Sequence, residues 1–365
     1  MIEELQLVMI REGDTQLFVP ADHESNGPST SSMPVFYNPK MEFNRDMSVF
    51  LLGKLLRGGQ SLLDGMSATG ARGIRVRRET GLELRLHLND SNPLATEVIE
   101  KNLTLNGIVD AEVTRQDLRT LLLTARYDCV DVDPFGTPAP FFPMAAGAVR
   151  NNGVLCVTAT DTGAMSGIFT SACLRKYGCR GSRTPFHHEI GVRNMLGFIA
   201  REAARQDLGI QPLVSYYADH YIRAFVRVER GAKRADDALR KLGFCAYDPK
   251  TLEREYRKED DGGSIGPIWI GRTCDPDLLS EMNLQPHLRT ADRIAELVGH
   301  LRGEASVNRP HFTLDELSRA QKINTPKIDG LIEKLRAIGK ASRTHFGPKT
   351  FTTDADIGEI IRAMK

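Results

Sequence analysis

Residues 131–137 read DVDPFGT and place a carboxylate, a proline and an aromatic ring at the end of an apolar predicted strand. Pro134 lacks a backbone N–H and fixes the chain direction, so its carbonyl and Asp133 could point at one amino group. Phe135 offers a ring face for stacking, which contributes roughly 1–3 kcal/mol per base. A nucleobase amine is a poor nucleophile because its lone pair is delocalised into the ring. Two acceptors aimed at its protons would help it attack, so the motif indicates alkylation of an exocyclic NH2. The structural alternative is a β-turn that buries the phenylalanine.

Three other predicted strands also end in an aspartate. The stretch LLDGMSATGARG places Asp64 before a loop of small residues, which lets a ligand approach the backbone at the start of a helix. Asp90 ends the next strand, where an acid can accept hydrogen bonds from two ribose hydroxyls. Asp117 and Leu118 follow the third strand and could bind an exocyclic amine and cover a ring face.

A purely structural role is the alternative at each of these positions. Asp90 also starts a helix well together with Pro93, Asp117 could cap another helix, and the loop after Asp64 could be a plain tight turn. The carboxyl ends of parallel strands share one edge of an open α/β sheet, and such sheets bind ligands at that edge. Taken together, the three aspartates therefore favour a site for a nucleotide-like ligand.

The elements that must position these residues alternate between strand and helix, which predicts an α/β fold with helices on both faces of a parallel sheet. Strands are predicted near 61–66, 83–89, 111–115, 127–132 and 152–159. Helices are predicted near 45–57, 71–80, 93–106, 118–125, 139–149 and 187–207, the first with Asn44 or Asp46 as a possible cap. The stretches PLVSYYA and YIRAFVRVE add two closing strands, giving seven that end in an antiparallel hairpin. LQLVMI and TQLFVP, on either side of REGD, predict a separate hairpin near the start.

The last part of the sequence has a different pattern. Residues 246–268 are polar and Gly-rich, typical of an excursion or a junction. From about residue 272 short helices dominate, and the order helix, turn, helix, β-ribbon resembles a winged helix. We therefore expect a first domain over 1–271, which includes the N-terminal hairpin, and a smaller α+β domain over 272–365.

Composition limits the partners. No apolar run reaches 18 residues, so no membrane span is expected. The six cysteines are scattered with no CxxC pair and are predicted to be buried thiols of a reducing, cytoplasmic environment. The net charge is +1, so a nucleic-acid partner would need local basic patches. Solvated helix faces are the alternative for such patches, whose candidates are Arg72, Arg75, Arg77 and Arg78; Arg175, Lys176, Arg180 and Arg183; and the last 56 residues.

At these motifs the chain resembles class I S-adenosylmethionine-dependent methyltransferases, because its acid-Pro-aromatic sequence is similar to the (N/D/S)PP(Y/F) signature of amino-methylating enzymes. It resembles most closely the tRNA guanine-26 N2-dimethyltransferase family, especially its archaeal members. The stretches that carry this resemblance are PVFYNPKMEFNRD (34–46), SATGARGIR (67–75), DVDPFGTP (131–138), VTATD (157–161), YYADHYIRAFV (216–226), GPIWIG (266–271) and ASRTHFGPKTFTTDA (341–355).

The resemblance implies a Rossmann-like seven-stranded sheet and transfer of methyl groups from S-adenosylmethionine to N2 of guanine 26 in tRNA. By position it implies Asp133, Pro134 and Phe135 as the catalytic set, with Phe135 stacking on the guanine. It also implies that Arg45, Arg72, Asp90, Asp117 and Leu118 bind the cofactor. Asp64, at the end of the first predicted strand, completes the expected cofactor site. The residues expected where the target base enters are Asp161, Tyr217 and His220, with a core role as the alternative for Tyr217 and Tyr221.

The family resemblance also bears on metals, partners and alternatives. Some family members carry a zinc site of two CxxC knuckles, but only Cys245 and Cys274 occur in that region, so no metal is expected. The expected partner is tRNA, bound by a cytoplasmic monomer. Other functions left open are methylation of another tRNA guanine, of an adenine N6, or tRNA binding without catalysis.

Overall fold

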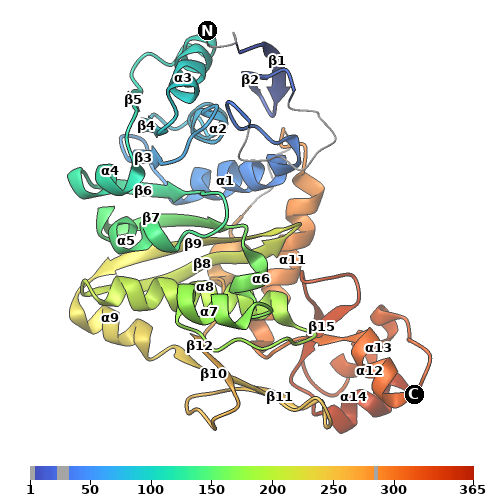
Figure 1. The fold of residues 1–365 in the computed structure, drawn as a ribbon. Coiled ribbons are helices and arrows are strands. Elements are labelled where there is room, and N and C mark those ends of the chain that lie inside the picture. The colour runs from blue at the N-terminus through green and yellow to red at the C-terminus, as the bar shows by residue number, and fades with distance from the viewer. Residues whose placement is uncertain (1–4, 23–32, 283–286) are drawn as a thin grey trace. The chain divides into compact units, whose positions relative to one another are not determined.

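A seven-stranded sheet in the order β5-β4-β3-β6-β7-β9-β8 is the main feature of the computed structural model, which describes residues 5–22, 33–282 and 287–365 (Figure 1). Its strands are β3 (Ser61–Asp64), β4 (Arg85–Asn89), β5 (Glu112–Thr114), β6 (Tyr127–Val132), β7 (Val149–Ala159), β8 (Leu208–Ala218) and β9 (Tyr221–Arg230). The pairs among β3 to β7 are parallel, and β8 pairs with β9 in antiparallel fashion. The predicted α/β sheet with a closing hairpin is therefore confirmed.

The strand order reverses next to β3. The chain passes from β3 outward to β4 and β5, then returns to the other side of β3 with β6 and β7. Ligands of open α/β sheets bind beyond the carboxyl ends of the strands at such a reversal. The ends of β3 and β6 are therefore the place where a site is expected.

Helices connect the strands, and those over 162–165, 170–177 and 232–239 were not predicted from the sequence. They are α2 (Ala71–Glu79), α3 (Pro93–Leu105), α4 (Leu118–Thr124), the 3-10 turn η2 (Ala139–Phe141) with α5 (Phe142–Ala148), α6 (Thr162–Met165), α7 (Thr170–Tyr177), α8 (His187–Ala204) and α9 (Ala232–Leu239). Because helices cover both faces, the strands are apolar on successive residues rather than alternately, as in the fully buried β3. The six cysteines are all buried thiols, as predicted, and none of them forms a disulfide.

The start of α1 (Glu42–Leu55) differs from the prediction. Neither Asn44 nor Asp46 caps this helix, since both lie inside it and are fully buried. The chain instead enters the helix through the 3-10 turn η1 (Pro39–Met41), where the Asn38 side chain accepts a hydrogen bond from the backbone N of Lys40. The two polar side chains are therefore available for contacts with other elements.

Smaller sheets complete the described chain. The predicted N-terminal hairpin is confirmed as β1 (Leu7–Glu12) paired with β2 (Thr15–Pro20). The polar stretch after β9 was predicted only as a junction, but it contributes to a three-stranded sheet of β10 (Leu242–Tyr247), β11 (Arg254–Arg257) and β12 (Ile265–Trp269). The exposed, Gly-rich turn over 259–263 connects β11 and β12. Because this turn dominates the composition of the stretch, the two short strands were not recognised in the sequence.

The last elements follow the order expected of a winged helix. They are α10 (Pro276–Ser280), α11 (Ala291–Val307), β13 (Phe312–Thr313), α12 (Leu314–Gln321), α13 (Ile328–Arg336), β14 (Ala341–Arg343), β15 (Thr350–Thr353) and α14 (Ile357–Met364). The strands form one sheet in the order β13-β15-β14, and a separate apolar cluster around Leu317, Leu335 and Phe351 lies beneath the helices. The helix-turn-helix and the β-ribbon predicted from the pattern are both present.

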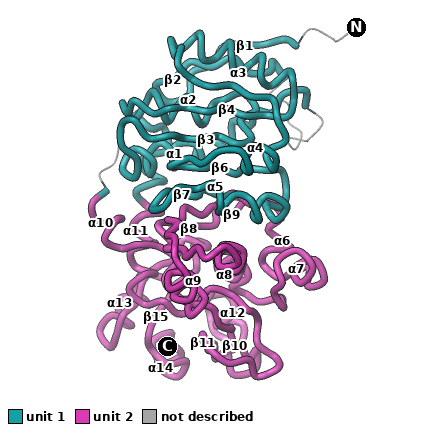
Figure 2. Tube along the Cα trace, turned by 90° about the vertical axis from the view of Figure 1, so that its left-hand side faces the viewer, with its two compact units in different colours: residues 1–157, 282–295 teal, residues 158–281, 296–365 magenta. Residues whose placement is uncertain are grey.

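Contacts divide the chain into two compact units (Figure 2). Unit 1 comprises Met1–Val157 and Met282–Ala295, and unit 2 comprises Thr158–Glu281 and Glu296–Lys365. The predicted site residues from Arg45 to Phe135 belong to unit 1, whereas Asp161, Tyr217 and His220 belong to unit 2.

Candidate active site at the carboxyl edge of the sheet

The loop between β3 and α2 brings the backbone close to strand β4 and to the start of helix α4. A Cβ atom on Gly73 would lie 2.5 Å from Leu88 Cδ2, and one on Gly65 would lie 2.8 Å from Leu118 Cδ1. Gly70 has φ of 77° as the N-cap of α2, a left-handed conformation that glycine adopts without strain. The close packing of α2 on the sheet therefore requires small residues in this loop. As a result, the first turn of α2 lies next to the carboxyl ends of the strands.

Asp64 ends β3 beneath this loop and is buried. Its Oδ2 accepts a hydrogen bond of 3.0 Å from the backbone N of Gly73, in the first turn of α2. Burial, and then the neighbouring Asp131 carboxylate, raise the pKa of Asp64 to about 7, although Arg72 opposes this shift. Two acids, Asp64 and Asp131, therefore lie close together at this edge of the sheet, and a ligand with a positive charge would favour their ionised forms.

Asp90 joins the β3–α2 loop to the start of α3. Its Oδ2 accepts from the backbone N of Ala68 at 2.9 Å, and its Oδ1 accepts from the backbone N of Asn92 at 2.9 Å. The cap of α3 is Asn92, whose side chain accepts from the backbone N of Leu94. Asp90 is thus not the helix cap. Each of its oxygens has a further lone pair at the tip of β4.

Asp117 does cap a helix. Its Oδ1 accepts from the backbone N of Arg119 at 2.8 Å, and the Arg119 guanidinium lies 2.6 Å from Oδ2. The hydrogen bonds from Arg119 lower the pKa of Asp117 to about 2. Leu118 is buried and contacts the glycine at position 65, so its side chain helps to close the end of β3.

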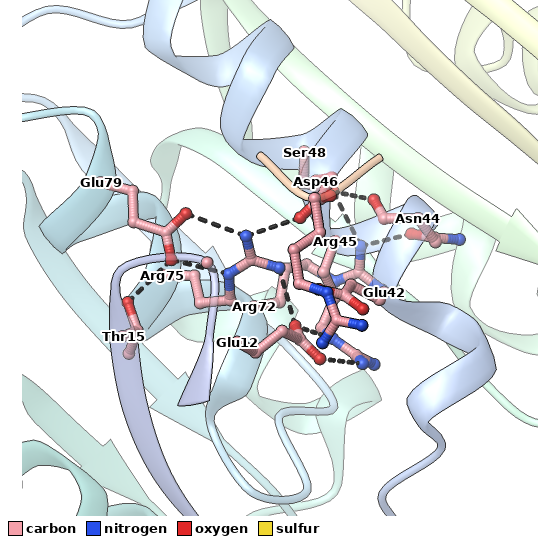
Figure 3. Close-up of polar contacts among 12 residues, drawn as sticks. Glu12, Thr15, Glu42, Asn44, Arg45, Asp46, Ser48, Arg72, Arg75 and Glu79 are labelled. Atoms are coloured by element: carbon pink, nitrogen blue, oxygen red, sulfur yellow. Dashed lines mark hydrogen bonds and ion pairs between the residues drawn. The ribbon is translucent and has the colours of Figure 1, made fainter. Parts of the chain in front are cut away.

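Arg45 is held by a carboxylate of the N-terminal hairpin (Figure 3). Its Nε lies 2.6 Å from Glu12 Oε1 and its Nη2 lies 2.5 Å from Glu12 Oε2, a bidentate pair in which both side chains are buried. Burial opposes ionisation of Glu12, but Arg45 and then Arg75 lower its pKa to about 2. The family resemblance implied Arg45 as a cofactor-binding residue, and no local pattern in the sequence indicated this distant acid.

Arg72 holds the carboxylate of the acid-Pro-aromatic turn. Its Nη2 pairs with Asp133, while its Nη1 donates to Asn44 Oδ1 at 2.6 Å and Ser48 Oγ at 2.8 Å. Its Nε also lies 3.8 Å from Asp131. Three elements, α1, α2 and the end of β6, thus fix the orientation of Asp133. Asn44 and Ser48 were not predicted as site residues. The sequence feature that could have indicated them is the run of polar residues near the start of α1, which face all sides of a buried helix.

Phe135 is presented to solvent, with 57% of its surface exposed, so the alternative of a buried Phe is wrong. Pro134 before it is buried, and Gly136 after it turns the chain with φ of 76°. The Phe36 ring meets the Phe135 ring edge to face, with centroids 4.7 Å apart. Phe36 lies in the stretch that carried the family resemblance, but its pairing with Phe135 was not predicted.

The remaining predicted residues lie in unit 2. The Asp161 carboxylate accepts from Tyr177 Oη at 2.7 Å and from Lys176 Nζ at 3.0 Å. The Tyr217 ring stacks on His188 with centroids 3.8 Å apart. The Tyr217 hydroxyl donates to the backbone O of residue 219 at 2.6 Å, and its backbone N donates to Nε2 of the histidine at 345 at 3.1 Å.

Two further tyrosine and histidine positions can be compared with their predictions. His220 is exposed at the turn between β8 and β9, whereas Tyr221 is buried, in agreement with its core alternative. Within the described ranges, no three His, Cys, Asp or Glu side chains are grouped so that they could hold a metal ion. No described helix has the length and apolar character needed to span a bilayer.

Comparisons with known proteins agree with this geometry. Residues 13–365 match the family model described as N2,N2-dimethylguanosine tRNA methyltransferase. A tRNA (guanine(26)-N(2))-dimethyltransferase of Pyrobaculum neutrophilum is 42% identical over 99% of this chain and 100% of its own length. One of Thermococcus kodakarensis is 37% identical over 99% of this chain and 100% of its own length. The structure of Trm1 from Pyrococcus horikoshii with S-adenosyl-L-methionine has a TM-score of 0.87 and 33% identity, over 98% of this chain and 100% of that one. The chain belongs to the N2,N2-dimethylguanosine tRNA methyltransferase family.

Proposed function

We infer that this chain transfers methyl groups from S-adenosylmethionine to the exocyclic N2 of guanine 26 in tRNA, giving N2-methylguanosine and then N2,N2-dimethylguanosine. The observation that carries this inference is the turn after β6. It combines an oriented carboxylate, Asp133, with an exposed ring, Phe135, in a chain of this family.

The residues at the strand ends fit S-adenosylmethionine. Asp90 offers lone pairs at the tip of β4 for ribose hydroxyls, and the closely packed glycine loop leaves the start of α2 at the strand ends. Asp64 and its carboxylate neighbour suit a cationic ligand. When bound, S-adenosylmethionine supplies a methyl group on a positively charged sulfur. The proposed binding residues are those predicted from the sequence, Arg45, Asp64, Arg72, Asp90, Asp117 and Leu118.

The acid-Pro-aromatic turn would act on the base. The carboxylate of Asp133 and the carbonyl of Pro134 would accept hydrogen bonds from the N2 amine. An Asp133 oxygen would take the amine proton as the N–C bond forms and the bond between the methyl carbon and the sulfonium sulfur breaks, its electron pair staying on sulfur. Phe135 would stack on the guanine, with Phe36 supporting its ring from the side. Arg72 acts as a positioning residue because it fixes the Asp133 carboxylate. Catalysis is then mainly orientation of the two reactants.

The wider substrate would be held outside this turn. Asp161, Tyr217 and His220 are proposed as residues that contact the tRNA, whose target base must leave its stack to be methylated. The segment 272–365 is proposed as a separate tRNA-binding domain of the winged-helix type. A cytoplasmic monomer is the proposed form of the protein.

The test is incubation of the protein with S-adenosylmethionine and an unmodified tRNA transcript, followed by digestion and mass spectrometry of the nucleosides. N2,N2-dimethylguanosine should form and should disappear when guanine 26 is replaced by adenine. Another methylated nucleoside would retain the fold and discard the target.

The Asp133→Ala variant tests the role of the carboxylate. Methyl transfer should fall below detection, because the N2 amine loses its proton acceptor, while affinity for S-adenosylmethionine changes by less than about threefold, on the order of 0.6 kcal/mol. Equilibrium dialysis and the nucleoside assay measure the two quantities. Unchanged activity in this variant would sink the proposed role.

A further inference from the structure

The segment between α6 and the start of α8 is basic in a chain that is almost neutral. Residues 162–188 contain Arg175, Lys176, Arg180 and Arg183 but no Asp or Glu, whereas the whole chain has a net charge of +1. Such a local excess of positive charge gives this surface a preference for a polyanion that the average charge of the protein does not.

Two of these four basic side chains form ion pairs with acidic residues of the same chain. Lys176 binds the Asp161 carboxylate, and Arg180 binds Asp260 and the backbone O of Ser264. The side chains of Arg175 and Arg183 are exposed and make no hydrogen bond or ion pair with any residue that the structure describes. Their guanidinium groups are therefore available to a ligand.

An exposed aromatic ring lies in the same segment. Phe169 is 64% exposed at the N-cap of α7, and its backbone N donates to the backbone O of Gly163 at 3.1 Å. A Cβ atom on Gly163 would lie 2.6 Å from Phe169 Cε2, so the ring rests against the backbone of α6. This contact supports the ring on one side and leaves most of its area open.

The loop that carries Arg183 crosses the segment that carries Phe169. A Cβ atom on Gly181 would lie 2.4 Å from the Cα of Gly167, so two backbone segments cross in direct contact. Phe169 follows one of these glycines by two residues and Arg183 follows the other by two. Helix α7 buries Cys173 and Tyr177, so Leu174 and Arg175 lie on its outer side. We call Phe169, Leu174, Arg175 and Arg183 the α7 surface.

We propose that the α7 surface binds the tRNA substrate, with Arg175 and Arg183 contacting phosphates and Phe169 stacking on an exposed base. This proposal rests on the proposed function and names a contact surface for the same substrate. Stacking between bases and aromatic side chains accepts any base, and arginine binds phosphate in a two-pronged geometry. Lys176 and Tyr177 of α7 hold Asp161, so tRNA on this surface would lie on the helix that positions a second proposed tRNA-contacting residue.

The first test compares two double variants of the full chain in a filter-binding titration with an unmodified tRNA transcript. Arg175→Ala with Arg183→Ala should lower affinity roughly tenfold and flatten the plot of log affinity against log salt by about 0.7–0.9 per lost phosphate contact. The matched control is Arg205→Ala with Arg234→Ala, which also removes two exposed arginines, each near a glutamate. An equal effect of the two double variants, or no effect of the first, would overturn the proposal.

The second test separates stacking from charge. Phe169→Ala should raise the KM for tRNA roughly tenfold, within the range of base–aromatic stacking, while kcat at saturating tRNA and affinity for S-adenosylmethionine stay unchanged. Phe169→Tyr should restore the wild-type KM. If wild-type protein methylates guanine 26 and Phe169→Ala has the same KM, the surface is wrong and the function stands. If wild-type protein binds tRNA through this surface without methylating it, the function is wrong and the surface stands.

Discussion

At the scale of single residues, the raised pKa of Asp64 makes the free energy of unfolding depend on pH. Its pKa is about 7 in the folded protein and close to 3.8 in the unfolded chain. The unfolded chain therefore ionises this carboxyl first, and the folded state loses stability as the pH rises from about 4 to 7. Asp64→Asn keeps an acceptor for the backbone N of Gly73 and has no charge to bury.

The Asp64→Asn variant should therefore be more stable than wild type by a margin that grows between pH 4 and 7 and is constant above. At about 1.4 kcal/mol per pKa unit the margin is up to about 4 kcal/mol. Urea unfolding at several pH values measures it. Asp110→Asn, at an exposed position, is the control because it removes no buried charge. A margin that shrinks with rising pH would contradict this account of Asp64.

Phe36 is the second residue-scale prediction. An edge-to-face aromatic pair contributes roughly 0.5–1.5 kcal/mol, and the Phe36 ring is the lateral support of Phe135. Phe36→Ala should lower kcat/KM for tRNA roughly three- to tenfold and leave affinity for S-adenosylmethionine unchanged. Steady-state methylation and equilibrium dialysis measure the two effects. Phe36→Tyr, which keeps the ring, should behave as wild type; a loss as large as that of the Ala variant would show that the ring contact is not the cause.

At the scale of elements, one buried carboxylate attaches the hairpin β1–β2 to α1 and α2 (Figure 3). Glu12 pairs with Arg45 of α1 and with Arg75 of α2, and it accepts from Tyr37 Oη at 2.6 Å. Removing one partner of a buried ion pair leaves an uncompensated charge. Glu12→Gln should therefore lower the free energy of unfolding by roughly 3–5 kcal/mol.

The pH dependence of this contribution follows from the pKa of Glu12, which is about 2 in the folded protein against 4.5 in the unfolded chain. A depressed carboxyl pKa stabilises the fold fully above pH 4.5, and the contribution is lost as the pH falls toward 2. The difference between wild type and Glu12→Gln should accordingly shrink in acid. Glu83→Gln, an exposed partner of Arg77, is the control and should change stability little. A difference that stays constant down to pH 3 would contradict the assignment.

The element scale also shows what could be predicted from the sequence. Strands β3 to β7 and their helices follow from apolar runs and turn residues that are local in the chain, and their predicted positions are confirmed within a few residues. The role of Asp46 could not be found in this way. It looks like a cap, but its Oδ2 accepts from Thr290 Oγ1, which lies 244 residues later. Partners that are distant in sequence leave no local pattern.

The same limit applies to the site. The strand-end aspartates and the acid-Pro-aromatic turn were visible, because each motif is complete within a few residues. The orientation of Asp133 was not visible, because it depends on Arg72 and on two polar side chains of a separate helix. The sequence thus indicates which groups could react, and the fold determines which groups hold them.

At the scale of the whole molecule, charge is nearly balanced, so tRNA must be bound by local groups rather than by a uniform field. In the last turn of α12 and the turn that leads to α13, Arg319, Lys322 and Lys327 are exposed and have no side-chain partner among the described residues. The nearby acids Asp315 and Asp329 are paired with Lys349 and Arg343, and therefore do not offset these cations.

Lys322→Ala with Lys327→Ala should therefore weaken tRNA binding roughly tenfold and reduce its dependence on salt, as loss of two phosphate contacts would. Lys54→Ala with Lys250→Ala removes the same charge at other positions and is the control. Filter binding between 50 and 200 mM salt, about the range over which such contacts are screened, measures the effect. Effects of distant, independent sites add, so combining this variant with Arg175→Ala and Arg183→Ala should multiply the two losses. A combined loss no greater than either alone would mean that one tRNA molecule does not use both surfaces, and the binding role of one of them would have to be abandoned.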